Sequence, residues 1–235
     1  MRAMRIIAEF KKTGGARYIS HLDLQRAVQR ALRRSGLPVR YTTGFSPHQV
    51  LSFASALSLG FISRGEIMDV AMEEPVTAAE FEARMSAQLP ASLAPISAHE
   101  VEDGYPGLMS LVESADYLVE MPVEPDLDDA ALRERIEKVF AEPIIAEKKT
   151  KAGIKELDLR EQVLCFELQA LSEDHAARFF LRCDCSPEGA LNPRLLFDAV
   201  SESLGATGDA EYCRLALWAD KRGTTPLWGR KGAQD

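Results

Sequence analysis

The sequence predicts an α+β protein built from two tandem ferredoxin-like halves, and two observations lead to this prediction. Over residues 4–101, segments typical of strands and helices follow one another in the order β-α-β-β-α-β, which is the ferredoxin-like supersecondary pattern. A similar order, with one additional hairpin, returns over residues 117–219. We therefore expect two sheets, each covered by two helices, with a junction near residues 104–116.

The elements of the first half carry local start and stop signals. Residues 4–10 (MRIIAEF) predict a strand, and Ser20 with Asp23 three positions later predicts the start of a helix. Gly36 and Pro38 then stop that helix. The other predicted elements are extended segments at 38–42 and 50–57, a strand at 65–72, a helix opened by the Thr77–Glu80 capping box, and a strand at 93–101.

The second half repeats the architecture without repeating the sequence. Asn192, followed by Pro193, predicts the start of a helix that continues to Leu204. The other predicted elements are a strand at 117–123, a helix at 128–140, a hairpin at 144–159, the strands LCFELQAL and ARFFLRC, and a strand at 211–219. We predict an N-terminal ferredoxin-like domain with a basic helix at 1–110, a C-terminal ferredoxin-like domain at 111–220 and a flexible tail at 221–235.

Charge is distributed unevenly along the chain. The net charge of the 235 residues is −8, which argues against a generic nucleic-acid-binding protein. Residues 1–50, however, hold ten Lys/Arg and two Asp/Glu, a balance of +8, so the remaining residues hold 28 − 10 = 18 basic and 36 − 2 = 34 acidic side chains, a balance of −16. A local basic face on an acidic body predicts contact with a polyanion.

Several functional classes find no support in the sequence. The four cysteines lie in strand-like runs, which is typical of reduced thiols in a cytoplasmic protein. A metal site from Cys183, Cys185, Cys213 and His175 would lack the usual C-x₂-C spacing, and we predict no metal site. The common phosphate-binding, dinucleotide-binding, zinc-protease and nucleophile-elbow motifs are missing, so we predict no cofactor. No signal peptide is visible, and no run of about 20 apolar residues predicts a membrane span.

Four arginines fall on a single face of the first predicted helix, at positions i, i+4, i+7 and i+8: Arg26, Arg30, Arg33 and Arg34. Convergent guanidinium groups suit phosphate binding. The alternative is a solvated surface whose charges complement the helix dipole. Arg17 and Arg40 add to this basic region, and Lys148, Lys149 and Lys151 decorate the predicted hairpin, where lysines can also serve only to discourage edge pairing.

The stretch GFSPH, residues 44–48, is too apolar for an ordinary loop and too interrupted for a helix. Gly44 permits unusual backbone angles, and Phe45 can stack on a base or fill a core. Beside a basic helix, such a loop can cradle a phosphate or a nucleotide backbone. The alternative is a tightly packed strand connection. We include Gly44, Phe45 and His48 among the predicted RNA-binding residues.

A second hypothesis is catalytic. His21 and His48, with Tyr18 close to the first in sequence, could cleave RNA by acid–base chemistry on the 2′-hydroxyl without a metal ion. The alternative is that each histidine is a hydrogen-bonded structural residue. We predict no catalytic residues in the first instance and keep this set as the rival interpretation.

The segments RYISHLDLQRAVQRALRRSGLPVRYTTGFSPHQVLSFASALSLGF, EIMDV and EKKTKAGIKELDLRE carry a family resemblance. The chain resembles the bacterial radical-SAM-associated (radical SAM-linked) proteins, a domain of unknown function that stands beside, or is fused after, a radical SAM enzyme. Gln49, where proline is expected, and Ala54, where glycine is commoner, depart from that pattern. The resemblance implies an accessory role and supplies no catalytic residue.

The favoured interpretation is therefore a non-catalytic, cytoplasmic accessory module that binds RNA (tRNA or rRNA), a partner radical SAM enzyme, or both. Two alternatives stay open: a metal-independent endoribonuclease that uses His21 or His48, and a pure protein-interaction adaptor. The sequence leaves the oligomeric state undetermined.

Overall fold

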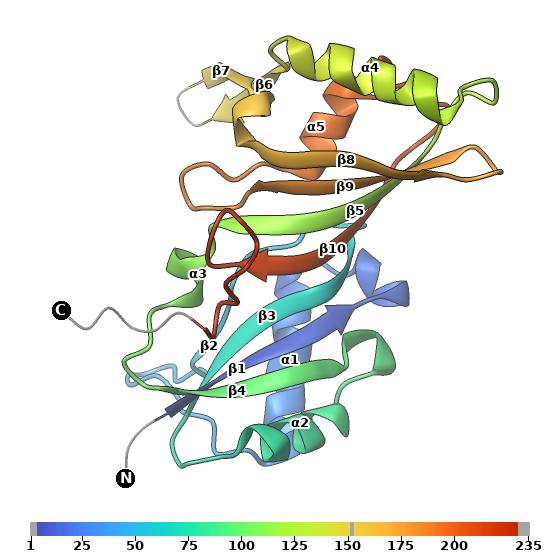
Figure 1. Ribbon diagram of the computed structural model, residues 1–235. Helices are drawn as coiled ribbons and strands as arrows, with labels where there is room; N and C mark the ends of the chain where they lie inside the picture. The colour runs from blue at the N-terminus through green and yellow to red at the C-terminus, as the bar shows by residue number, and fades with distance from the viewer. Residues whose placement is uncertain (1–3, 151–152, 230–235) are drawn as a thin grey trace.

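A computed structural model describes residues 4–150 and 153–229, with side chains 148–150 and 153–155 left aside. Its centre is an eight-stranded sheet (Figure 1). The strands lie side by side in the order β4 (Pro95–Glu102), β1 (Met4–Lys12), β3 (Ile62–Met72), β10 (Glu211–Trp218), β5 (Ser114–Pro122), β9 (Ala176–Asp184) and β8 (Val163–Leu171), and the short β2 (Leu51–Phe53) also pairs with β3.

Each half of this sheet has the ferredoxin-like strand order. The first half reads β4-β1-β3-β2 and carries α1 (His21–Ser35) and α2 (Ala78–Ser86). The second reads β10-β5-β9-β8 and carries α4 (Asp129–Ala141) and α5 (Pro193–Val200). The predicted fold class, α+β with two tandem ferredoxin-like halves, is confirmed. The division of the chain into domains at residues 110 and 220 stays a prediction.

The two halves share one sheet, and the expectation of two separate sheets is wrong. Strands β3 and β10 pair in parallel through Ile62↔Cys213 and Ser63↔Arg214, whereas the other pairings in the sheet are antiparallel. The cause is the shortness of β2, which pairs only with the Met68–Val70 part of β3. The beginning of β3 therefore keeps a free edge, which β10 occupies.

The predicted helix starts are confirmed by their capping bonds. Ser20 Oγ accepts a hydrogen bond from the backbone N–H of Asp23, Thr77 caps α2 in the same way, and Asn192 caps α5. Gly36 ends α1 with φ of 67°, a left-handed conformation that glycine adopts without strain. The stripe of α1 that packs on the sheet is Leu24, Val28, Ala31 and Leu32.

The segment between α1 and β3 is less regular than predicted. Where extended segments are predicted at 38–42 and 50–57, the regular pairing is limited to β2 and the isolated bridges Val39↔Met72 and Tyr41↔Gln49. The predicted hairpin at 144–159 is confirmed as the two-stranded sheet of β6 (Ile145–Thr150) and β7 (Gly153–Asp158). The short elements are the 3₁₀ turns η1 (Gly14–Tyr18), η2 (Ala91–Leu93) and η3 (Leu159–Gln162), and the helix α3 (Leu108–Leu111).

Residues 221–229, assigned above to a flexible tail, pack on the sheet. Leu227 is fully buried, its carbonyl accepts a hydrogen bond of 2.5 Å from the Tyr105 hydroxyl, and Trp228 stacks on His99 at 4.1 Å between ring centroids. In the sequence, Leu227 and Trp228 stand among polar residues, so no apolar pattern predicts that this segment packs on the sheet. Residues 230–235 lie outside the described residues.

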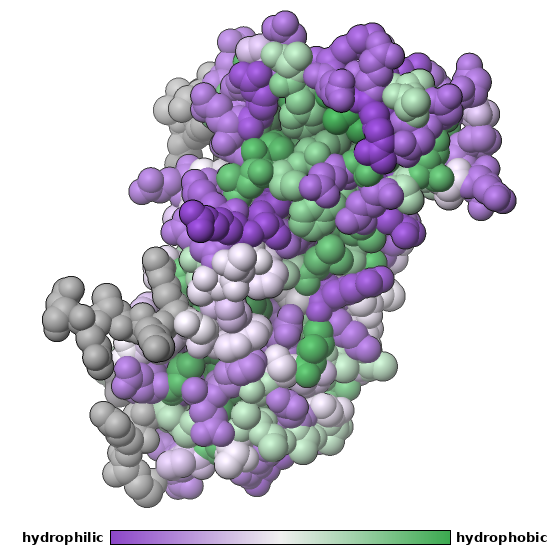
Figure 2. Space-filling model, viewed as in Figure 1, coloured by the Kyte–Doolittle hydropathy of each residue, from purple (hydrophilic) through white to green (hydrophobic). Residues whose placement is uncertain are grey.

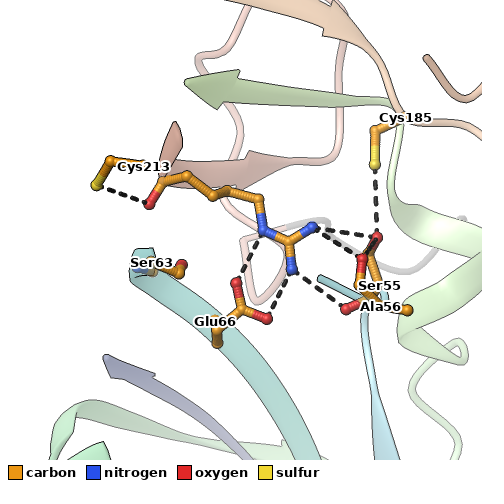
Figure 3. Close-up of polar contacts among 8 residues, drawn as sticks. Ser55, Ala56, Ser63, Glu66, Cys185 and Cys213 are labelled. Atoms are coloured by element: carbon orange, nitrogen blue, oxygen red, sulfur yellow. Dashed lines mark hydrogen bonds and ion pairs between the residues drawn. The ribbon is translucent and has the colours of Figure 1, made fainter. Parts of the chain in front are cut away.

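The hydrophobic core continues across the junction between the halves. One cluster lies within the first half, between its sheet and α1 and α2. The other belongs mainly to the second half but includes Ile7 and Phe61 of the first. At the junction the buried Arg214 of β10 forms a double hydrogen bond with Glu66 of β3 and donates to the Ser55 and Ala56 carbonyls (Figure 3).

Hydrophilic and hydrophobic residues are unevenly distributed over the surface (Figure 2). In Figure 2, hydrophilic residues gather at the top of the view, where α4 lies. Among the described residues, no helix is both long and apolar enough to cross a membrane.

Candidate nucleic-acid interface

Helix α1 presents arginines on the side opposite its buried stripe. Arg26, Arg30 and Arg33 are exposed, and so is Leu22 one turn before Arg26. At 100° per residue these positions fall within one quarter of the helix circumference, along a helix of about 22 Å. We call Arg26, Arg30 and Arg33 the arginine face.

The arginine face keeps hydrogen-bond donors available. Within the described chain, the side chains of Arg30 and Arg33 make no hydrogen bond or ion pair. Arg26 approaches Asp23 at 3.3 Å, but both side chains are more than half exposed, so this pair is weak. Arg34, also predicted as a binding residue, is already engaged, because it donates to the side chain and carbonyl of Gln88 at 3.2 and 2.9 Å.

Many other arginines lie next to carboxylates. Examples are the ion pairs Arg133–Asp129, Arg135–Glu124, Arg178–Glu120, Arg182–Asp116 and Arg214–Glu66. A guanidinium that already faces a carboxylate has fewer donors to offer a phosphate. The contrast sets Arg30 and Arg33 apart from these arginines.

A cavity of about 390 Å³ lies between the two halves, beside the start of α1. Tyr18 is 72% exposed at its edge. Arg17, also predicted as a binding residue, is partly committed: its Nε donates to the Gly60 carbonyl at 2.9 Å, and its Nη1 lies 3.4 Å from Glu211. Asp198 and Asp209 also line this junction cavity, which makes it unfavourable for a phosphate.

Arg194 of α5 also lines the junction cavity, and the sequence analysis missed it. Its guanidinium lies over the rings of Phe61 and Tyr212, which stack on each other at 4.3 Å. Burial and the charge of Asp198 raise the pKa of Tyr212 to about 12. No sequence signal could have found this cluster, because its members come from both halves.

Residues 40–50 form a hairpin that carries the GFSPH stretch. The backbone N–H of Thr42 donates to the His48 carbonyl, and Val50 donates to Arg40, both at 2.8 Å. Gly44 has φ of 123°, which suits glycine alone, while space around it is open. Phe45 is fully exposed. The tip of the loop is thus exposed and is not a tightly packed strand connection.

A second cavity, also of about 390 Å³, lies at the base of this hairpin. Arg40, predicted as a binding residue, lines it and pairs with Asp103 at 2.6 Å; this hydrogen bond raises the pKa of Arg40 and lowers that of Asp103. Arg5 pairs there with Asp69, which raises the pKa of Arg5. We call this the hairpin cavity.

The hairpin cavity also contains His48 and Gln49. His48 Nδ1 lies 3.1 Å from the Thr42 hydroxyl. Gln49 is only 4% exposed, and its side-chain oxygen Oε1 is buried without a hydrogen-bond partner. In the sequence, Gln49 stood out only as a departure from the family pattern.

The predicted binding residues therefore fall in separate places. Within the described residues, no hydrogen bond, ion pair or ring contact joins the 43–48 loop to the arginine face. Arg40 follows the end of α1 by five residues, a reach of at most about 18 Å. Lys148 and Lys149 lie on β6, whose side chains there are not described, and Lys151 lies outside the described residues.

Within the described residues, His21, His48 and Tyr18 of the ribonuclease hypothesis share no hydrogen bond or ring contact with one another. His21 packs edge-on against Phe53 at 5.3 Å between ring centroids. His48 lines the hairpin cavity, whereas Tyr18 lines the junction cavity and lies beside the Arg17 guanidinium. Each side chain thus has separate neighbours.

The cysteines and His175 of the discarded metal hypothesis are also apart. Cys183 on β9 and Cys213 on β10 are separated by β5, which corresponds to about 10 Å. Burial raises the pKa of both thiols. Among the described residues, no group of three or more His, Cys, Asp or Glu side chains is placed to hold a metal ion.

The chain belongs to a family described as an uncharacterized protein conserved in bacteria, whose model matches residues 5–193. This description does not mention a radical SAM enzyme. A comparison with curated proteins found no match.

One similar solved structure is titled "Crystal Structure of a Cbf5-Nop10-Gar1 Complex". The match has a TM-score of 0.51 and 11% sequence identity, and it covers 90% of this chain. The chain spans about half of that solved chain (48%). At this identity the likeness concerns the fold alone.

Proposed function

We propose that this protein is a non-catalytic module that binds RNA through the arginine face of α1 and the exposed hairpin at 40–50. The observation that carries the proposal is the pair Arg30 and Arg33, which are exposed and have no partner among the described residues. Guanidinium groups in this state can each donate two parallel hydrogen bonds to a phosphate.

The aromatic residues add a second element of the proposal. Phe45 is fully exposed on the hairpin, and Tyr18 is 72% exposed just before α1. Single-stranded RNA is commonly bound by cations that contact the backbone and by aromatic rings on which unpaired bases stack. An RNA with unpaired nucleotides, such as a tRNA or rRNA loop, suits this combination.

The proposal that a radical SAM enzyme is the partner rests on the sequence resemblance alone. In the proposed arrangement this module would present bound RNA to that enzyme. If no RNA binds, the protein-interaction adaptor takes its place.

Ultraviolet crosslinking in cells, followed by sequencing of the copurified RNA, tests the proposal. We expect reads concentrated in unpaired regions of a few RNA species. Reads no more abundant than those from an Arg30→Glu/Arg33→Glu variant would contradict it.

A further inference from the structure

We propose that the hairpin cavity is a binding pocket for one unpaired nucleobase, with the Gln49 amide as its hydrogen-bonding group. This inference rests on the proposed RNA binding and specifies what the RNA presents. It is carried by three features of the cavity: an unsatisfied buried amide, internally neutralised charges and an exposed aromatic ring on the adjoining loop.

Gln49 is the first feature. Its Oε1 is the one buried side-chain nitrogen or oxygen in the described part of the chain that lacks a hydrogen-bond partner. Buried polar groups in proteins are almost always paired, because burying an amide without a hydrogen bond is unfavourable. Gln49 also lines the cavity. A ligand that donates an N–H would supply the missing partner once the amide turns toward the cavity, because Oε1 is shielded from solvent in the free protein.

The charges of the cavity are the second feature. Both carboxylates in its lining, Asp69 and Asp103, are paired with its two arginines, Arg5 and Arg40. Arg5 also donates to the Tyr105 carbonyl. A phosphate would have to displace one of these carboxylates, whereas a neutral polar ligand would not. The cavity therefore favours an uncharged group.

The chemistry of a nucleobase fits these conditions. A base is neutral and planar, and its edge carries an N–H donor beside an acceptor, the pattern that a Gln amide recognises through two hydrogen bonds. The volume of about 390 Å³ lies within the range of small-molecule sites, about 300–1,000 Å³. His48 adds a ring nitrogen, Nε2, that has no partner among the described residues.

The hairpin itself is the third feature. Its tip exposes Phe45 completely, and its base forms one wall of the cavity through Thr42 and His48. A base in the cavity would thus have a neighbour able to stack on Phe45. Because Arg40 follows α1 closely in the chain, the same RNA strand can reach the arginine face.

The test compares two probes of equal length, a mixed-sequence single-stranded RNA and an abasic sugar–phosphate strand. The variant is Gln49→Met, which keeps the size of the side chain and removes its amide. We expect the wild type to bind the RNA more tightly than the abasic strand, and Gln49→Met to lose roughly five- to 150-fold in RNA affinity, the range of one well-formed base contact. Its affinity for the abasic strand should not change.

Stability gives an independent readout. Since Gln49 Oε1 has no partner in the free protein, Gln49→Met should unfold at the same temperature as the wild type or at a higher one. A merely structural glutamine would instead lose stability on replacement. Gln169→Met, the same change at an exposed position of β8, is the matched control and should leave both probes unaffected.

The outcomes separate this inference from the proposed function. Equal binding of the RNA by Gln49→Met and wild type would overturn the base pocket and leave RNA binding by the arginine face intact. If the wild type binds neither probe, the RNA proposal fails. A thermal-shift measurement with free nucleosides then tests whether the cavity binds a base. A thermal shift with adenosine, cytidine, guanosine or uridine that disappears in Gln49→Met supports it, and no shift with any of the four overturns it.

Discussion

The guanidinium of Arg214 on β10 lies against the carboxylate of Glu66 on β3, with Nη2 2.6 Å from Oε2 and Nε 2.8 Å from Oε1. The two side chains are 1% and 3% exposed, and they join the two halves of the sheet (Figure 3). Burial alone would lower the pKa of Arg214, but the charge of Glu66 raises it above its ordinary value. The Arg214 guanidinium therefore keeps its charge at the junction.

Removal of one partner should destabilise the protein strongly. We expect Arg214→Met to lower the free energy of unfolding by about 3–5 kcal/mol, because Glu66 would be left buried and unpaired. The double variant Arg214→Met/Glu66→Met should recover most of this loss. Recovery is incomplete because the Ser55 and Ala56 carbonyls lose their donor.

Urea unfolding followed by circular dichroism measures these differences. The control is Arg178→Met, which removes an exposed pair with Glu120 and should cost less than about 1 kcal/mol. A double variant no more stable than Arg214→Met would show that the pair is not the source of the effect.

Charge reversal on the arginine face should weaken RNA binding. We expect Arg30→Glu/Arg33→Glu to bind every single-stranded RNA less tightly, since phosphate contacts carry no sequence information. The slope of log affinity against log salt should become shallower by about 1.4, or about 0.7 for each lost contact. Fluorescence anisotropy at several salt concentrations provides both quantities.

The control for that experiment has the same change in net charge. Lys138→Glu/Arg222→Glu alters two exposed positions in the second half and the C-terminal segment. Its RNA affinity should stay close to that of the wild type. Equal losses in both double variants would indicate an effect of total charge, and the arginine face would have no special part.

Phe45 should matter for RNA and not for folding. Because the ring is fully exposed, Phe45→Ala should change the free energy of unfolding by less than about 0.5 kcal/mol. Loss of one stacked base should nevertheless cost about 1–3 kcal/mol of binding. Met109→Ala, at another exposed apolar side chain, serves as the control; RNA affinity unchanged in Phe45→Ala would exclude stacking there.

Sequence reasoning succeeded where the signal is local. Ser20, Thr77 and Asn192 cap helices because a short polar side chain can reach backbone N–H groups two or three positions later. It failed where distant segments meet. An arginine within β10 gave no sign of burial, since its partner Glu66 is 148 residues away.

The candidate site shows the same limit. The arginine face follows from helical spacing within one segment, and the sequence predicted all three of its members together with Arg34. The hairpin cavity combines Arg5, Gln49, Asp69 and Asp103 from four segments. Only the tertiary structure brings these residues together, so no local pattern could predict the cavity.

The isolated protein should not cleave RNA. Since His21, His48 and Tyr18 have separate neighbours, we expect no products from a labelled RNA incubated with purified protein and a chelator. Loss of a general acid or base typically reduces a rate by about 10²–10⁴-fold. Chelator-resistant cleavage that disappears in His21→Ala or His48→Ala would therefore revive the ribonuclease hypothesis.

His99 should make stability depend on pH. Its ring stacks on Trp228, and its Nε2 lies 3.3 Å from Ser97 Oγ, which also donates to Glu9. Burial lowers the pKa of His99, an effect that the charge of Glu82 partly opposes. The native state therefore takes up its proton at lower pH than the unfolded chain, whose histidine pKa is about 6.5.

The sign of the effect follows from proton binding. Below about pH 6.5 the unfolded chain binds more protons than the native state. The free energy of unfolding should therefore decrease as the pH is lowered, until His99 is protonated in the native state as well. His99→Phe, which keeps a ring against Trp228, should lose this dependence. Burial raises the pKa of Glu9, so protonation of Glu9 should increase the free energy of unfolding as the pH is lowered, opposite to the effect of His99. Because Glu9 is present in both the wild type and His99→Phe, the difference between the two proteins reports His99 alone.

Trp228 reports the same event directly. Trp218 and Trp228 are the only tryptophans, so a Trp218→Phe variant leaves Trp228 as the single emitter. Protonation of the stacked imidazole should quench its fluorescence, with a midpoint below pH 6.5 that is missing in His99→Phe. A midpoint at or above 6.5, with circular dichroism unchanged, would show that the ring of His99 is not held in the half-buried stack that the structure describes.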